Sequence, residues 1–256
     1  MNKLLNSHFI SSMASQLMGV AFPPICRLCN DSKEAFPDSY ICQSCLGNLN
    51  FIPHHRCLKC GLPNPSAHTV SMDCCHCAPL KFHFDYAQSV LFADQNSMKL
   101  IHKLKYRQAT WLARTIARIM LCGCKALFQG QSCPHGWDII VPVPLHSKRL
   151  KERGFNQSDI IARYLAQSLE IPVRYKSIKR IKFTETQTGF GRAQRFNNIK
   201  NAFSPGPQSY EVTNKNVILL DDVMTTGATL NECAKQLKLQ GSKSITAISA
   251  IRGQYA

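Results

Sequence analysis

The chain has 256 residues, of which 45% are hydrophobic, and it carries a formal net charge of +16 at pH 7. This composition suits one large core, or one ordinary domain with a small additional one, and no segment approaches the roughly 20 consecutive apolar residues of a membrane-spanning helix. Residues 1–98 are balanced in charge, so the whole positive excess lies in residues 99–256. This excess indicates a polyanionic partner, either a phosphorylated small molecule or a nucleic acid, with a solvated basic surface as the simpler alternative.

Residues 1–21 predict a short amphipathic helix. Leu5, Phe9, Met13 and Leu17 recur every four residues, which places them on one helical face. Polar side chains interrupt this stretch, unlike the apolar core of a signal peptide, so we expect a cytoplasmic protein in a reducing compartment. Packing against the body of the protein is the expected role of this helix, and docking of a partner is the alternative.

Residues 22–80 are expected to form a zinc-binding module. The chain has 13 cysteines, too many for a reducing compartment unless a metal uses them. Eight of them form Cys-x-x-Cys pairs, namely Cys26 and Cys29, Cys42 and Cys45, Cys57 and Cys60, and Cys74 and Cys77. Two pairs complete one closed tetrahedral sulfur site, so the sequence predicts two structural zinc ions.

The grouping of these ligands stays open at this stage. Consecutive pairs would share an ion in a duplicated ribbon, whereas a cross-braced module would join the first pair with the third. Cys75 or His76 is an alternative ligand to Cys74. A closed site has no open coordination position, so zinc is expected to fold the module rather than take part in catalysis.

Residues 81–256 are predicted to form an α/β domain with a twisted, mostly parallel sheet and helices on both faces. Its first part is read from hydrophobic periodicity, helix-ending signals and proline positions. The expected elements are a strand near 85–92, helices near 95–106 and 111–127, a strand beginning at 138, and a helix over 157–169.

Two basic segments follow strands of this domain. Residues 147–158 form a loop after the strand that ends at Pro142. Residues 180–203 are polar and basic, and are predicted to be a mobile loop that closes over a site and excludes water. Phe183, Phe190, Phe196 and Phe203 alternate there with basic residues, which is typical of a stacking surface for single-stranded nucleic acid, although core packing is the alternative for these rings.

The most informative stretch is residues 217–230. An apolar strand over 217–220 ends in Asp221 and Asp222, and a loop of hydroxyl residues with one glycine follows. A helix then begins near Thr229 and is expected to end at Gly241, before a second strand over 244–251. This order predicts one βαβ unit with its functional loop at the carboxyl end of a strand.

The side chains of this loop match the two halves of a ribose 5-phosphate. The hydroxyls of Thr225, Thr226 and Thr229, the small Gly227 and the start of a helix favour a phosphate. The two carboxylates would repel phosphate, but they are suited to accepting hydrogen bonds from vicinal ribose hydroxyls.

This stretch resembles the phosphoribosyl pyrophosphate (PRPP) signature of type I phosphoribosyltransferases. The resemblance implies PRPP binding, together with Mg²⁺, by Asp221, Asp222 and the five residues Thr225, Thr226, Gly227, Ala228 and Thr229. Enzymes of this type place a pyrophosphate-binding loop after an earlier core strand, and here Arg149 and Arg153 would supply its cations.

Nearly the whole chain resembles the ComF family. The motifs that carry the resemblance are the Cys-x-x-Cys pairs, Leu100 to Tyr106, Pro142-Val-Pro-Leu, Arg149-x-x-x-Arg-Gly-Phe-Asn-Gln, Thr184-x-x-Gln187, Arg195-x-x-Asn198, Ala202-Phe203, and Leu220 to Thr229. The resemblance implies a zinc module joined to a type I phosphoribosyltransferase domain. It also implies a flexible loop containing Thr184, Gln187, Arg192, Arg195 and Asn198.

The same resemblance implies a cytoplasmic role in natural transformation, with single-stranded DNA and a competence helicase or other uptake proteins as partners. Two further hypotheses stay open: an active phosphoribosyltransferase that releases pyrophosphate, and a PRPP-sensing regulator without turnover. No general base or acceptor is identified, so catalytic residues are not assigned.

Overall fold

The computed structural model describes residues 25–31, 40–53, 55–63, 74–106, 109–124, 136–184 and 191–253. The predicted amphipathic helix over 1–21 lies outside these residues, as do Gln187 and Phe190. The chain forms two compact units, residues 1–49 and residues 50–256. The described residues of the first unit include Cys26, Cys29, Cys42 and Cys45 and the short helix α2 (Gln43–Gly47).

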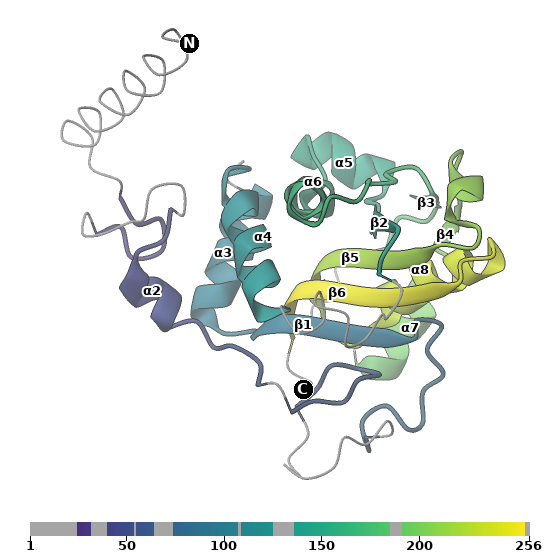
Figure 1. Ribbon diagram of the computed structural model, residues 1–256, viewed down its shortest axis with the longest axis horizontal. Helices are drawn as coiled ribbons and strands as arrows, with labels where there is room; N and C mark the ends of the chain where they lie inside the picture. The colour runs from purple at the N-terminus through teal and green to yellow at the C-terminus, as the bar shows by residue number, and fades with distance from the viewer. Residues whose placement is uncertain are drawn as a thin grey trace, which may run out of the picture. The chain divides into compact units, whose positions relative to one another are not determined.

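The second unit is built on a four-stranded parallel sheet with the order β1-β6-β5-β2. Figure 1 shows β1, β6 and β5 side by side. The strands are β1 (Tyr86–Phe92), β2 (Ile139–Pro142), β5 (Asn216–Met224) and β6 (Ser244–Arg252). The crossovers between strands place all the carboxyl ends at one edge of the sheet, where ligands bind in such folds.

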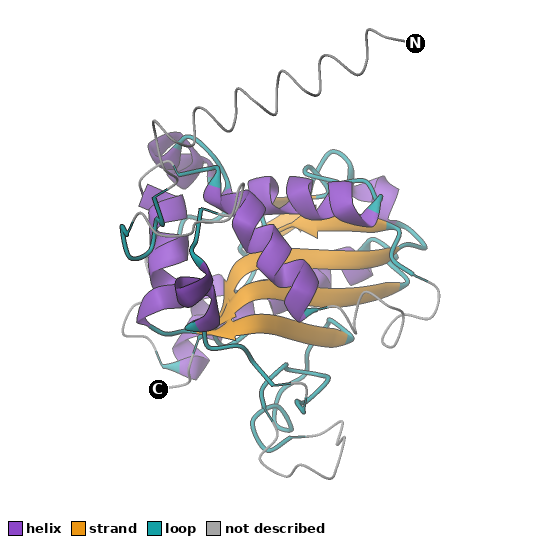
Figure 2. Ribbon diagram, turned by 60° about the vertical axis from the view of Figure 1, so that its left-hand side comes forward, coloured by secondary structure: helices purple, strands orange, loops and turns teal. Residues whose placement is uncertain are grey.

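Helices cover both faces of the sheet, as Figure 2 shows. The helices α4 and α6 pack on one face, and α8 packs on the other beside α7. The longer helices are α3 (Gln95–Tyr106), α4 (Leu112–Gly123), α6 (Gln157–Leu169) and α8 (Ala228–Leu239). The shorter elements are α5 (Ser147–Arg153), α7 (Arg192–Ile199), the 3₁₀ helix η2 (Ser209–Val212), and an antiparallel pair, β3 (Ile178–Arg180) with β4 (Phe203–Pro205).

The core follows from the alternation of side chains along β5. Val217 and Leu219 join a buried cluster with Leu230 and Leu237 of α8, while the intervening residues point to the opposite face. Every residue from Asn216 to Leu220 is buried, as expected for a central parallel strand covered on both faces. The predicted fold class is therefore confirmed.

Three local predictions need correction. The strand predicted over 217–220 continues to Met224, so Asp221 and Asp222 lie within it, because β6 pairs with it as far as Arg252. The loop predicted over 147–158 contains α5, which is capped by the side chain of His146. The predicted mobile loop over 180–203 contains α7, begins at the last residue of β3 and ends at the first residue of β4, and only residues 185–190 of it lie outside the described part.

The other long elements match their predicted positions closely. In particular, α3 and α6 have the predicted bounds, and Gly241 follows the Gln240 cap of α8 with a φ of +83°. Among the helices in the described residues, none is both long enough and apolar enough to cross a membrane.

Candidate functional site

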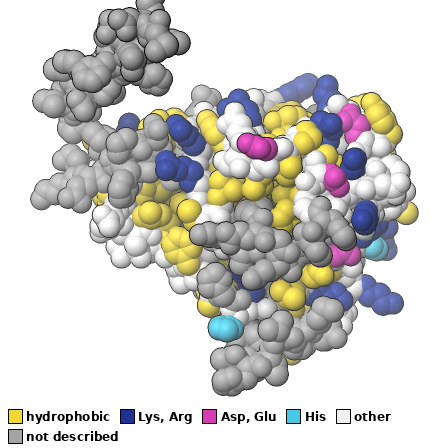
Figure 3. Space-filling view, viewed as in Figure 1, with side chains coloured by type: hydrophobic (Ala, Val, Ile, Leu, Met, Phe, Trp, Pro, Cys, Tyr) yellow, Lys and Arg dark blue, Asp and Glu magenta, His cyan; other side chains and the backbone are white. Residues whose placement is uncertain are grey.

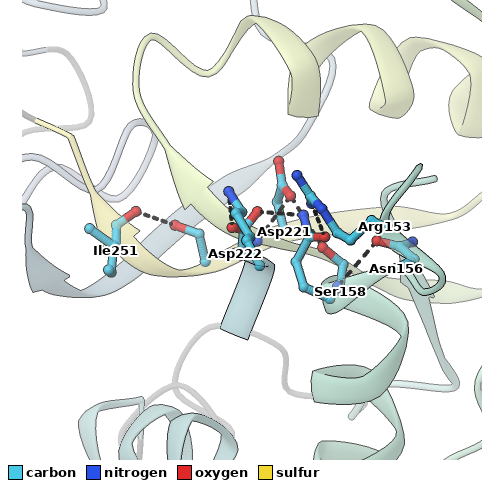
Figure 4. Close-up of polar contacts among 9 residues, drawn as sticks. Arg153, Asn156, Ser158, Asp221, Asp222 and Ile251 are labelled. Carbon is cyan, nitrogen blue, oxygen red and sulfur yellow. Dashed lines mark hydrogen bonds and ion pairs between the residues drawn. The ribbon is translucent and has the colours of Figure 1, made fainter. Parts of the chain in front are cut away.

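Two adjacent carboxylates lie at the carboxyl end of β5, facing the first turn of α6 (Figure 4). Asp222 is almost completely buried, and its Oδ2 lies 2.5 Å from Nζ of Lys105 at the end of α3. Gln157 Nε2 donates a hydrogen bond of 3.2 Å to the other oxygen of Asp222. Ser158 donates from its hydroxyl to Oδ1 of Asp221 at 3.3 Å. Both acids are thus held in place by residues far away in the sequence.

The pKa values of the two acids shift in opposite directions. Burial, and then repulsion from Asp222, raise the pKa of Asp221 well above its ordinary value. Burial also acts to raise the pKa of Asp222, but attraction to Lys105 and hydrogen bonds outweigh it, and this pKa is lowered. Asp221 is therefore the member of the pair that takes up a proton first as the pH falls.

The loop after β5 leads into α8 through Gly227, which caps the helix with a φ of +82°. A Cβ at this position would lie 3.0 Å from Cε of Met224 and 3.4 Å from the ring of Phe82, so a larger residue would crowd these side chains. Thr226 Oγ1 accepts a hydrogen bond of 3.4 Å from the N–H of Ala228. The helix start, with its positive dipole end, offers a small concave site for an anion.

An open cleft of about 1180 Å³ joins this loop to the acidic pair. Five cationic side chains line it, namely Lys105, Arg149, Arg153, Arg180 and Arg195. They come from α3, α5, β3 and α7, so distant parts of the sequence supply them. The cleft therefore places hydroxyl-binding carboxylates between an anion-binding loop and a set of cations.

Two of these cations are held by short contacts. Arg153 donates to Oε1 of Gln157 at 2.6 Å, and its guanidinium lies 5.5 Å from the centre of the Tyr106 ring. Arg149 donates to the carbonyl of Thr184 at 3.2 Å, which ties α5 to the segment after β3. Both guanidinium groups are therefore positioned before any ligand binds.

The structure brings most of the predicted site residues together. Asp221, Asp222, Arg149 and Arg153 line one cleft, together with Thr184, Arg195, Thr225 and Thr229. The loop residues Thr226, Gly227 and Ala228 line the small concave site at the start of α8. Arg192 and Asn198 are not among the described residues that line this cleft. Arg192 instead donates a hydrogen bond of 2.6 Å to the carbonyl of His76.

The sequence reasoning missed four residues of the site, namely Lys105, Gln157, Ser158 and Arg180. Gln157 follows the Asn156 cap of α6, within the Gly-Phe-Asn-Gln motif, so its polar position at a helix start was a usable signal. Lys105 is the second-last residue of the Leu100–Tyr106 motif in α3, but no local pattern indicates that it contacts Asp222.

Two clusters of four thiols match the predicted zinc ligands. In each cluster the sulfur atoms lie within 4.8 Å of one another, and the groups are Cys26, Cys29, Cys42 and Cys45, and Cys57, Cys60, Cys74 and Cys77. A tetrahedral zinc site with Zn–S bonds of about 2.3 Å has sulfur atoms about 3.8 Å apart. Separations between sulfur atoms run from 3.4 Å for Cys60–Cys74 to 3.9 Å for Cys29–Cys42, which is close to this value, so both clusters fit zinc.

The clusters combine consecutive Cys-x-x-Cys pairs and are not cross-braced. Cys74 belongs to the second cluster, whereas Cys75 is exposed. The N–H of Cys42 points to the sulfur of Cys26 at 3.3 Å, a contact that stabilises a thiolate. We refer to these groups as the first and second Cys₄ sets.

Family models match two parts of the chain. A double zinc ribbon domain matches residues 17–78, and a phosphoribosyl transferase domain matches residues 151–254. The first match includes both Cys₄ sets, and the second includes α6, β5 and the loop before α8.

Curated relatives cover most of the chain. It is 31% identical to Competence protein F of Haemophilus influenzae, over 86% of this chain and 87% of that one. It is 30% identical to the DNA utilization protein YhgH of Escherichia coli K12, over 87% and 94%. It is 27% identical to Competence protein ComFC of Bacillus subtilis, over 94% and 100%.

Proposed function

The chain belongs to the ComF family of competence proteins, and from this premise we propose that it handles single-stranded DNA during uptake and binds PRPP in the cleft beside β5. The proposed binding of PRPP rests on one observation, namely that the phosphate loop, the acidic pair and the arginines all line one cleft. The names of the relatives, which refer to competence and DNA utilization, support the biological role. We further propose a cytoplasmic location, with a competence helicase or other uptake proteins as partners.

We propose that PRPP binds with its ribose on the acidic pair and its two phosphate ends on either side. Its 5-phosphate would bind the loop between Thr225 and Thr229, and its ribose hydroxyls would donate to Asp221 and Asp222. Its pyrophosphate would then lie against Arg149 and Arg153, whose planar guanidinium groups suit diphosphate oxygens.

Magnesium fits this arrangement. Carboxylates and phosphates are the ligands that Mg²⁺ prefers, and Asp221 and Asp222 would hold it together with oxygens of PRPP. When bound, Mg²⁺ would neutralise charge on the pyrophosphate leaving group. The protein's own contribution would be positioning of the ribose and charge stabilisation by the arginines.

Transfer of the phosphoribosyl group to an acceptor is a second candidate function. It is favoured by the arginines that would face the leaving group. A sensor that binds PRPP without turnover would use the same contacts. Pyrophosphate release in the presence of nucleobases, amines or DNA separates these two candidates.

The binding of DNA is supported by a basic, aromatic surface near α5. Phe183 is 44% exposed, and Nζ of Lys148 and the guanidinium of Arg149 lie 4.8 Å and 5.7 Å from the centre of its ring. Lys and Arg side chains outnumber acidic ones on the face shown in Figure 3. An exposed ring beside cations is suited to stacking a base while the cations contact phosphates.

Competitive titration tests the ligand. Mg²⁺–PRPP should bind the zinc-loaded protein, and both ribose 5-phosphate and pyrophosphate should displace it with lower affinity, because each occupies only half of the cleft. Failure of both compounds to compete, with PRPP bound, would place the ligand elsewhere.

Fluorescence anisotropy with a single-stranded oligonucleotide tests the DNA surface. Lys148→Ala should reduce the slope of log K against log salt by about 1, whereas Phe183→Ala should weaken binding tenfold or more at an unchanged slope. Equal binding by both variants and the wild type would exclude this surface.

A further inference from the structure

The second Cys₄ set is connected to the phosphate loop by a single aromatic residue. Phe82 packs against Cys57, Cys60 and Cys77 on one side and against the main core on the other. Its ring stacks on buried Phe84, with centroids 4.6 Å apart. It also lies directly behind Gly227, where a Cβ would come within 3.4 Å of its ring.

The chain after Phe82 runs along the helix that the phosphate loop begins. The N–H of His83 donates to Oδ1 of Asn231, in the first turn of α8, at 2.6 Å. Two residues later Asp85 contacts Lys238, in the last turn, at 3.0 Å. The N–H of Asn231 in turn donates to the carbonyl of Gly227 at 2.8 Å, so the loop and this segment share a partner.

The same Cys₄ set is also fixed to the edge of the sheet. The N–H of Ala87 in β1 donates to the carbonyl of Leu58 at 3.0 Å. A Cβ at Gly61 would lie 2.9 Å from the carbonyl oxygen of Ala87, so the knuckle is in direct contact with the strand. Arg192, which begins α7, donates to the carbonyl of His76 between two ligands. The second set therefore has fixed positions relative to β1, α7 and the phosphate loop.

We infer that the second Cys₄ set positions the phosphate loop through Phe82, so that the metal in this set, and not in the first, sets the affinity for a phosphate ligand. The described residues 55–63 and 74–80 contain no helix or strand, so a metal is needed to hold Phe82 from the Cys77 side. Without it, Phe82 loses the packing that keeps Gly227 and the start of α8 in place. Phe82 is thus a positioning residue, and this role rests on the proposed function.

Paired serine variants test the inference in the full chain. Cys74→Ser with Cys77→Ser removes the second site, and Cys29→Ser with Cys45→Ser removes the first, which lies in the other compact unit. Native mass spectrometry counts the remaining zinc. We expect the second-site variant to bind Mg²⁺–PRPP at least tenfold more weakly and to exchange the amide hydrogens of residues 225–231 at least tenfold faster. The first-site variant should stay within twofold of the wild type in both.

Two conservative variants test the inference even if the serine variants unfold. Phe82→Leu and Asn231→Ala should each keep both zinc ions, yet accelerate exchange in residues 225–231 and weaken PRPP several-fold. Unchanged exchange in the second-site variant and in Phe82→Leu would overturn the inference, as would equal effects from the two Cys₄ sets. Absence of PRPP binding by the wild type would instead reject the proposed ligand, while the exchange data would still decide the coupling.

Discussion

Asp221 and Asp222 are neighbours in the chain, but their pKa values shift in opposite directions, and Asp222 is the one that contacts Lys105. The sequence predicted both carboxylates from the strand and loop that surround them. It did not predict Lys105, Gln157 or Ser158, since contacts between residues of different helices and strands depend on the tertiary fold. The carboxylates could be predicted because they stand in the motif itself, whereas the residues that contact them from other helices could not.

Substitution of Lys105 should change the pH dependence of ligand binding. In Lys105→Met the attraction that lowers the pKa of Asp222 is lost, so this pKa rises and the acceptor is protonated at higher pH. We expect PRPP affinity to begin to fall at a higher pH than in the wild type as the solution is acidified, and stability to fall by about 1–3 kcal/mol. Calorimetric titrations at several pH values measure the first effect, with exposed Lys99→Met on the same helix as control. Identical pH profiles for Lys105→Met and the wild type would contradict the assignment.

Asp159 gives a separate prediction about stability. Burial raises its pKa to about 6, although a hydrogen bond from Asn156 acts in the opposite direction. The folded state therefore binds this proton more tightly than the unfolded state, and the resulting stability is present at low pH and lost as the pH rises through about 6. Asp159→Asn lacks this titration, so its free energy of unfolding, measured with urea and taken relative to the wild type, should rise by about 2 kcal/mol from pH 4 to pH 7. If the free energies of unfolding of the two proteins changed equally with pH, burial would not raise the pKa of Asp159.

At the scale of elements, hydrophobic runs and caps located the long helices and the central strands. The helix α5 was missed because its sequence is almost entirely polar, and its ends are set by the His146 cap and by Gly154 with a φ of +82°. The length of β5 was underestimated, since Val223 and Met224 are held by pairing with Ile251 and Arg252. Elements defined by local caps or by a neighbouring strand were therefore less predictable than those defined by hydrophobic periodicity.

The two glycines that flank α8 give a matched comparison. Gly227 and Gly241 have φ angles of +82° and +83°, so alanine at either position should cost about 1 kcal/mol of strain. Only at Gly227 does the added Cβ crowd Met224 and Phe82. Gly227→Ala should therefore lose an additional 1–2 kcal/mol or so and most PRPP binding, whereas Gly241→Ala should keep its affinity. Thermal unfolding and calorimetry measure both effects, and equal losses would mean that crowding at the loop is unimportant.

For the molecule as a whole, the fold class and the two Cys₄ sets were predictable because each depends on residues close together in the sequence. The predicted division at residues 21 and 80 stays a prediction. The compact units divide at residue 49, so the second Cys₄ set belongs to the same unit as the sheet. Sequence spacing could not indicate this, because the two sets are built from equivalent pairs.

The zinc content provides a prediction at this scale. The protein should carry two zinc ions, and Cys74→Ser should lose one of them, because Cys74 completes the second set. Cys75→Ser should retain both, since this thiol is exposed and outside the cluster. Native mass spectrometry measures the number of ions directly. Loss of zinc from Cys75→Ser, with both ions kept by Cys74→Ser, would show that Cys75 is the ligand.

The central claim is that a ribose 5-phosphate ligand lies across the acidic pair and the phosphate loop. Its most direct test is calorimetric titration of Mg²⁺–PRPP into the zinc-loaded wild type and into Asp222→Asn, with thermal unfolding to show that both are folded. We predict binding by the wild type and at least tenfold weaker binding by the variant, because the charged acceptor for the ribose is lost. Equal affinity in the two proteins, or no binding by a folded wild type, would contradict the account.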